Sequence, residues 1–139
     1  MKGKFFLDTN IFVYEFDDGS PEKSARASDL IREAIRSKRG VVSYQVVQEF
    51  FNVAFSGFKK PIEFGHAEHY LRTVFTPLLE VHSSPRLFLE GIRIRNAHRW
   101  HWYDCLVAAA ALEAGCDVLY SEDFQHGRTL EGMKIQNPF

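Results

Sequence analysis

The sequence lacks long apolar runs and has few cysteines. No segment approaches the roughly 20 consecutive apolar residues that cross a bilayer, and the run at residues 5–7 is too short for a signal peptide. The two cysteines, Cys105 and Cys116, lie on or just after one expected helix. At that spacing they would be roughly 16 Å apart, too far for a disulfide. We therefore expect a soluble cytoplasmic protein, not attached to a membrane, with reduced cysteines.

The sequence also lacks an excess of positive charge. Its 17 lysines and arginines nearly balance 18 aspartates and glutamates. A domain that binds nucleic acid through its whole surface has a strongly basic balance, so any RNA binding here must come from a local patch. No repeat, low-complexity tract or linker divides the 139 residues. We expect a single domain over residues 1–139.

Glycine-rich phosphate loops are missing as well. No GxGxxG or GxxxxGK[ST] run occurs, which disfavours a nucleotide-binding enzyme. Short apolar runs instead alternate with longer helical segments. Strands are expected at residues 4–7, 41–42, 79–81, 118–120 and 133–135, and helices at 11–16, 21–40, 45–55, 63–74, from 85 onward and 105–112. This alternation predicts an α/β fold with a mainly parallel sheet covered on both faces.

Four acidic residues stand where such a sheet places ligands. Asp8 and Asp123 follow expected strands, and Glu49 and Asp104 lie in early turns of expected helices. Ligands bind beyond the carboxyl ends of parallel strands, so the four could meet at one edge. Carboxylates this close repel one another, and a cation must neutralise them. Oxygen ligands suit Mg²⁺ or Mn²⁺, which can activate water against a phosphodiester.

Simpler explanations exist for each acid. Asp8 and Asp123 could cap a turn or a helix, and Asp104 could be favoured by a helix dipole. Glu49 is harder to explain in this way, because it lies among apolar residues on a helix that otherwise has the composition of a core. A buried carboxylate needs a partner or a metal, and an arginine could be that partner.

Four segments of the sequence resemble the PIN domain, specifically VapC-like toxins: FFLDTNIFVY, SYQVVQEFFNV, WYDCLVAAAALEAGCDVLYSED and FQHG. The resemblance covers essentially the whole chain and implies a three-layer α/β/α sandwich. It implies an endoribonuclease in which Mg²⁺ or Mn²⁺ is held by an acidic quartet, Asp8, Glu49, Asp104 and Asp123. Asn10 would orient the first acid or the water. Ser121, at a position that is often threonine in the family, would bond a metal-bound water or the last acid. Glu122 competes with Asp123 for the fourth position.

The resemblance also implies protein partners. VapC-like proteins form homodimers and bind an antitoxin, whose C-terminal segment lies in an apolar groove and blocks the acidic site. The first half of the chain has more phenylalanines than one small core easily hides, so we expect some of them to line that groove. The residues in question are Phe5, Phe6, Phe12, Phe16, Phe50, Phe51, Phe55 and Phe58.

Basic and aromatic residues lead toward Asp104. Arg86, Arg93, Arg95 and Arg99 are candidates to bind phosphates that flank the scissile bond, or they form a solvated helix face with an ion pair to Glu90. A neighbouring aromatic group either stacks on unpaired bases or packs a helix against its neighbour. The group comprises Trp100, Trp102 and Tyr103.

Other functions remain open at this point. Two histidine pairs, His66 with His69 and His98 with His101, share helical faces and raise zinc as an alternative, although no cysteine accompanies them at a zinc-motif interval. The chain could be a PIN-type nuclease outside toxin pairs, acting in RNA maturation or on structured DNA, or a catalytically silent binding module. A phosphoaspartyl phosphatase would need a second aspartate where this chain has Asn10.

Overall fold

The computed structural model describes residues 3–139. Within them, six strands form one sheet in the order β3-β2-β1-β4-β6-β5. Neighbouring strands run parallel, except that β5 pairs antiparallel with β6. The strands are β1 (Phe5–Leu7), β2 (Gly40–Ser43), β3 (Leu79–Val81), β4 (Val118–Tyr120), β5 (Thr129–Leu130) and β6 (Met133–Gln136). The predicted mainly parallel sheet is confirmed, and the two-residue β5 is the strand that the sequence pattern did not indicate.

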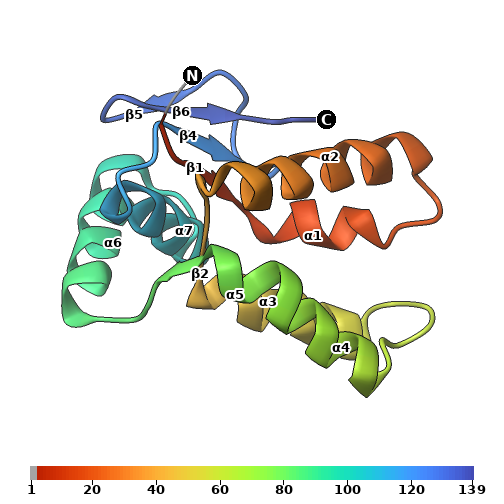
Figure 1. The fold of residues 1–139 in the computed structure, drawn as a ribbon. Coiled ribbons are helices and arrows are strands. Elements are labelled where there is room, and N and C mark those ends of the chain that lie inside the picture. The colour runs from red at the N-terminus through yellow and green to blue at the C-terminus, as the bar shows by residue number, and fades with distance from the viewer. Residues whose placement is uncertain (1–2) are drawn as a thin grey trace.

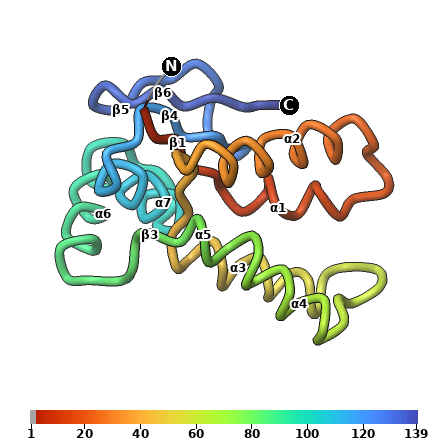
Figure 2. The backbone as a smooth tube through the Cα atoms, in the orientation of Figure 1, coloured from red at the N-terminus to blue at the C-terminus, as the bar shows by residue number. Residues whose placement is uncertain are grey.

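Helices flank this sheet. Figure 1 shows α1 and α2 on one side of it and α6 and α7 on the other, which gives the expected three layers. A helical arm made of α3, α4, a π-helical turn and α5 extends from the sheet, and the tube in Figure 2 follows the chain out and back along it. The elements are α1 (Thr9–Glu15), α2 (Pro21–Ser37), α3 (Tyr44–Ser56), α4 (Phe64–Tyr70), η1 (Leu71–Phe75), α5 (Thr76–Leu78), α6 (Pro85–His98) and α7 (Trp102–Glu113).

Helix α7 lies in the interior. Every residue from Cys105 to Ala111 is buried, as expected for a helix that is apolar on all sides. Gly91 allows α6 to approach it closely, because a Cβ at Gly91 would lie 3.0 Å from Leu106 Cδ2. The packing of α6 on α7 therefore fixes the start of α7, where Asp104 lies.

Most of the phenylalanines belong to the core, and the expectation that some of them line a partner groove stays a prediction for the others. Phe6, Phe12 and Phe50 are completely buried. The ring of Phe50 packs against Tyr70 and Phe75 of the arm, with centroids 5.1 and 5.2 Å away. The arm thus contributes its own aromatic side chains to the core. Of the eight residues named above, only Phe55 is exposed.

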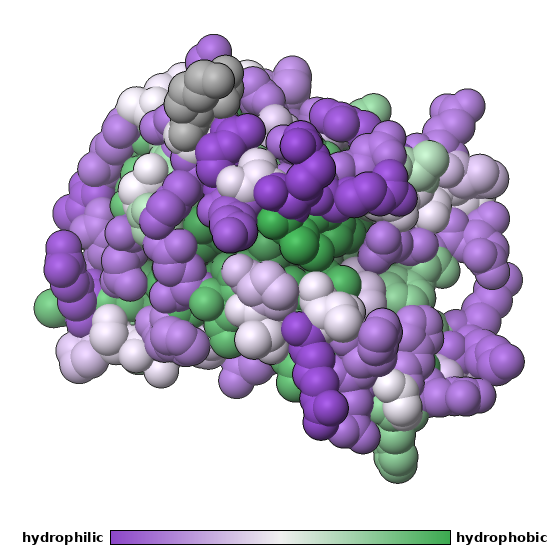
Figure 3. Space-filling model, in the orientation of Figure 1, coloured by the Kyte–Doolittle hydropathy of each residue, from purple (hydrophilic) through white to green (hydrophobic). Residues whose placement is uncertain are grey.

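On the face shown in Figure 3, hydrophilic residues predominate and hydrophobic residues show between them near the middle. Cys105 and Cys116 are buried free thiols, as expected. Among residues 3–139, no helix has both the length and the apolar character needed to cross a membrane.

Candidate active site

Asp8 is a buried carboxylate at the end of the central strand. It caps α1, and its Oδ1 accepts a hydrogen bond from the Thr9 N–H at 2.7 Å. Its Oδ2 accepts one from the Ser121 hydroxyl, also at 2.7 Å. The pKa of Asp8 is raised to about 7, mainly by burial and to a lesser extent by the charges of Asp123 and Glu49, which together outweigh the lowering effect of the two hydrogen bonds. An ionised Asp8 is therefore costly in the absence of a cation.

Ser121 joins the acid of β1 to the loop that follows β4. Its hydroxyl donates to Asp8 and accepts a hydrogen bond from the Asp123 N–H at 3.0 Å. The Ser121 side chain is completely buried. The two strands are also joined at this point by a hydrogen bond from the Asp8 N–H to the Tyr120 carbonyl at 3.0 Å. Two adjacent parallel strands thus bring Asp8 and Asp123 to the same edge of the sheet. Ser121 contacts the first acid directly and the last acid through its backbone.

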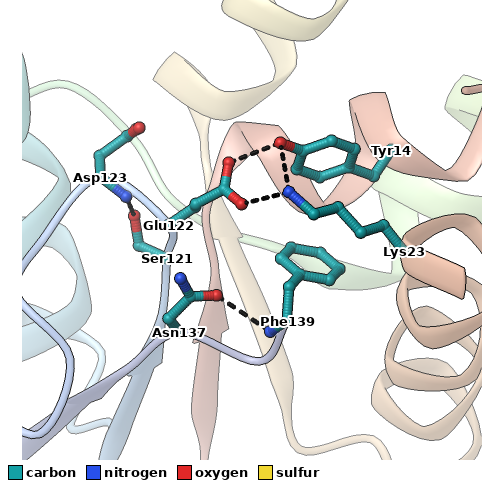
Figure 4. Close-up of polar contacts among 7 residues, drawn as sticks. All are labelled: Tyr14, Lys23, Ser121, Glu122, Asp123, Asn137 and Phe139. Carbon is teal, nitrogen blue, oxygen red and sulfur yellow. Dashed lines mark hydrogen bonds and ion pairs between the residues drawn. The ribbon is translucent and has the colours of Figure 1, made fainter. Parts of the chain in front are cut away.

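Glu122 and Asp123 point in different directions. Figure 4 shows the Glu122 carboxylate directed toward Tyr14 and Lys23, with Asp123 on the far side of the loop. Glu122 accepts hydrogen bonds from the Tyr14 hydroxyl at 2.6 Å and from Lys23 Nζ at 2.9 Å. Asp123 instead lines the cavity that also contains Asp8. Of the two neighbouring acids, the structure places only Asp123 with the other carboxylates.

Glu49 is oriented by two residues that the sequence analysis missed. The Thr9 hydroxyl donates to Glu49 Oε1 at 2.9 Å, and Gln45 Nε2 lies 3.5 Å from the same oxygen. Gln45 Nε2 also donates to the Tyr103 carbonyl at 3.2 Å, which connects α3 to α7. No arginine pairs with Glu49 among the ion pairs of residues 3–139. Gln45 and Glu49 are four residues apart on one helix, which places them side by side on the same helix face. This spacing was the sequence signal that could have revealed their contact.

Asp104 completes the set from the first turn of α7. Partial burial raises its pKa, and the nearby charges of Asp123 and Glu49 raise it further, while His101 lowers it. All four predicted acids line one cavity of about 390 Å³. A second cavity, of about 290 Å³, shares Asp104 and Asp123 with the first. The four acids therefore come together, although they belong to four separate parts of the chain.

This site suits a hard divalent cation. As they stand, no three carboxylate, histidine or cysteine side chains of residues 3–139 form a ready metal-binding group. The acids nevertheless line one cavity, and two of them have pKa values raised partly by their neighbours. Both side-chain polar atoms of Asn10 are buried there without a partner in the described chain. The carboxylates need a cation to offset their repulsion, and the Asn10 amide needs a hydrogen-bond partner. Oxygen donors of this kind suit Mg²⁺ or Mn²⁺.

Three of the four candidate RNA-binding arginines, Arg93, Arg95 and Arg99, have different surroundings. Arg93 forms ion pairs with Glu90 and Glu131. It therefore belongs to an ion-paired helix face, the second of the two interpretations given for these arginines. The Arg95 guanidinium donates to the backbone carbonyls of Arg99 and Trp100. Arg99 alone of the three lines a cavity next to the acids.

The aromatic residues and histidines near the site also differ in their contacts. Trp100 stacks on His98, with ring centroids 4.7 Å apart. Trp102 packs over Gly91, whereas Tyr103 is 63% exposed and lines the larger cavity. In the other histidine pair, the His66 ring packs against Phe16 and Tyr70. His126, in the loop after β4, accepts a hydrogen bond from the Asn137 N–H.

The structure thus combines a mainly parallel α/β sheet with four carboxylates gathered at one edge of it. The family model of the PIN domain matches residues 5–129 of the sequence. The chain therefore belongs to the PIN domain family. PIN domains are generally nucleases that depend on a divalent metal ion.

Solved structures agree on the fold. A chain of a toxin–antitoxin complex from Klebsiella pneumoniae superimposes with a TM-score of 0.71 at 15% identity, covering 98% of each chain. A chain of VapBC2 from Rickettsia felis, bound to a DNA fragment from its promoter, has a TM-score of 0.65 at 16% identity and covers 96% of this chain and 97% of that one. A comparison with curated proteins finds no significant match.

Proposed function

We propose that this chain is a metal-dependent endoribonuclease and the toxin of a VapBC-type toxin–antitoxin pair. The observation that carries the proposal is the convergence of Asp8, Glu49, Asp104 and Asp123 on one cavity of a PIN domain. Mg²⁺ or Mn²⁺ held by these acids would supply Lewis-acid chemistry, polarising the phosphodiester and lowering the pKa of water.

The protein's own residues prepare this site. Asp8 has both oxygens fixed by hydrogen bonds, so it holds its position when it ionises. Thr9 and Gln45 direct Glu49 toward the same cavity. Asn10 offers a buried amide, able both to donate and to accept, to a water or to the substrate. Preorganised groups of this kind cost little rearrangement when charge develops on the phosphate.

The toxin assignment is supported by fold and by the shape of the site. The two solved structures described above come from toxin–antitoxin complexes, and each matches nearly its whole length to this chain. The larger cavity also has an apolar wall, formed by Val13, Val53 and Val107 beside the exposed Tyr103. An antitoxin segment lying on that wall would cover the acids. We propose the same cytoplasmic, homodimeric arrangement that the family resemblance implies.

The nuclease activity is tested with purified protein freed of any partner. Total cellular RNA is incubated with Mg²⁺ or Mn²⁺, with EDTA as control, alongside the Asp8→Asn and Asp104→Asn variants. We expect discrete cleavage that EDTA and either substitution abolish. Cleavage of structured DNA but not RNA would favour a PIN-type nuclease outside toxin pairs. Metal binding without any cleavage would favour a silent binding module.

The toxin role is tested in growing bacteria. We expect expression of the chain to arrest growth, and co-expression with the product of a small neighbouring gene to restore it. The Asp104→Asn variant should not arrest growth. Arrest by this variant would show that toxicity does not depend on the acidic site.

A further inference from the structure

The smaller cavity extends the acidic site in one direction and brings two arginines to it. It is lined by Arg99, Arg128 and His101 together with Asp104 and Asp123. We propose that this cavity binds a phosphate of the RNA strand next to the scissile one, through the guanidinium groups of Arg99 and Arg128. The proposal rests on the proposed ribonuclease function and adds a substrate-binding subsite to it.

The charges of these two arginines are not neutralised by ion pairs. Neither Arg99 nor Arg128 lies within ion-pair distance of a carboxylate in the described structure. Arg93, on the preceding helix, differs because two glutamates pair with it. Arginine next to a phosphodiester is favoured, because its fork of N–H donors matches phosphate oxygens.

Neighbouring groups hold the Arg128 side chain and the Arg99 backbone at the cavity. The Arg128 guanidinium lies over the Trp100 ring, 5.2 Å from its centroid. The turn that contains Arg99 is fixed by Arg95, which donates to the carbonyls of Arg99 and Trp100. The Arg128 side chain, held in this way, loses less conformational freedom when it binds an anion.

The contacts of Trp100 favour a phosphate as the ligand over a base. Its ring already packs against His98, Phe124 and Arg128, so it serves to hold Arg128 and is not an open stacking platform. The two cavities share Asp104 and Asp123. An RNA strand whose scissile phosphate lies over the acids can therefore continue into the smaller cavity and place its next phosphate between the arginines.

The backbone offers a well-matched pair of variants. Arg99 and Lys38 both follow a helix in the left-handed conformation, with φ of 63° and 61°. Glycine adopts this conformation without strain, so Arg99→Gly and Lys38→Gly should both fold. Each substitution removes one positive charge, but Lys38 is exposed and is not among the residues that line the site. Arg128→Gln tests the second arginine.

The experiment measures binding of a short fluorescent single-stranded RNA in EDTA, at several salt concentrations. We expect Arg99→Gly and Arg128→Gln to bind roughly tenfold more weakly and to reduce the salt slope by about 0.7 each. Lys38→Gly should match the wild type. Equal binding by all three variants would overturn the subsite. Cleavage by the wild type is measured separately: its absence, with binding still weakened in the arginine variants, would reject the nuclease and keep the subsite.

Discussion

Replacing Asp8 with asparagine should stabilise the metal-free protein at neutral pH while abolishing its activity. Asp8 is 2% exposed and lies beside two other acids of the site. Its pKa of about 7 compares with an ordinary value of 3.8. Such a displacement corresponds to roughly 4 kcal/mol, since one pKa unit equals about 1.4 kcal/mol. Asparagine carries no charge and avoids this cost.

The hydrogen bonds reduce the expected gain. An asparagine oxygen can still accept from the Thr9 N–H, but its amide would donate to Ser121, whose hydroxyl hydrogen then loses its acceptor. This loss costs about 1–2 kcal/mol. The net gain at pH 8 is therefore about 2–3 kcal/mol, or roughly 5–10 °C in Tm.

The pH dependence has a definite sign. A raised carboxyl pKa means that the folded state binds the Asp8 proton more tightly than the unfolded state between pH 4 and 7. The contribution of Asp8 to the free energy of unfolding therefore falls as pH rises through this window and stays low above it. The Asp8→Asn variant lacks this titration. The difference in stability between variant and wild type should grow from pH 4 to pH 7.

The assay is urea unfolding in EDTA at several pH values, followed by circular dichroism. A stability difference that does not change with pH would refute this reasoning. A variant less stable than the wild type at pH 8 would refute it as well, because the buried charge would then cost less than the altered hydrogen bonds.

Three further predictions concern the cation, the core and the loop after β4. Saturating Mg²⁺ should stabilise the wild type by about 3 kcal/mol at a hundredfold excess over Kd, and thermal unfolding of Asp8→Asn should show no such gain. Gly40→Ala should cost roughly 2 kcal/mol or more in urea unfolding, because its Cβ would lie 2.2 Å from Ala34 Cβ; an unchanged midpoint would contradict that close approach. Glu122→Gln should retain RNA cleavage within a few-fold of wild type, whereas equal losses in Glu122→Gln and Asp123→Asn would mean that both acids act.

Local signals in the sequence predicted much of the fold. Apolar runs marked five of the six strands, because each is short, contains apolar residues and is followed by polar ones. Helix starts were marked by Ser20-Pro21 and Ser84-Pro85, and α2 and α6 begin at those prolines. Ser84 caps its helix by accepting from the Leu87 N–H at 3.0 Å, although Ser20 makes no side-chain cap bond.

The parts that the sequence could not predict depend on distant contacts. Glu122 and Asp123 are indistinguishable as neighbours in sequence, and they separate because Tyr14 and Lys23 bind Glu122 from 108 and 99 positions away. Arg128 belongs to no periodic pattern and reaches the site only because the loop after β4 folds beside Trp100. The phenylalanines exceeded what one small core would hold because the sequence did not reveal that the arm packs Tyr70 and Phe75 against them.

We propose that the four carboxylates act together as one metal-dependent site. The most direct test measures single-turnover RNA cleavage in Mn²⁺ for Asp8→Asn, Glu49→Gln, Asp104→Asn and Asp123→Asn, each compared with wild type. We predict that each substitution lowers the rate on the order of a hundredfold or more and that combining any two adds little, because residues acting as a unit are not additive. Wild-type rates in any two of these variants would contradict the account.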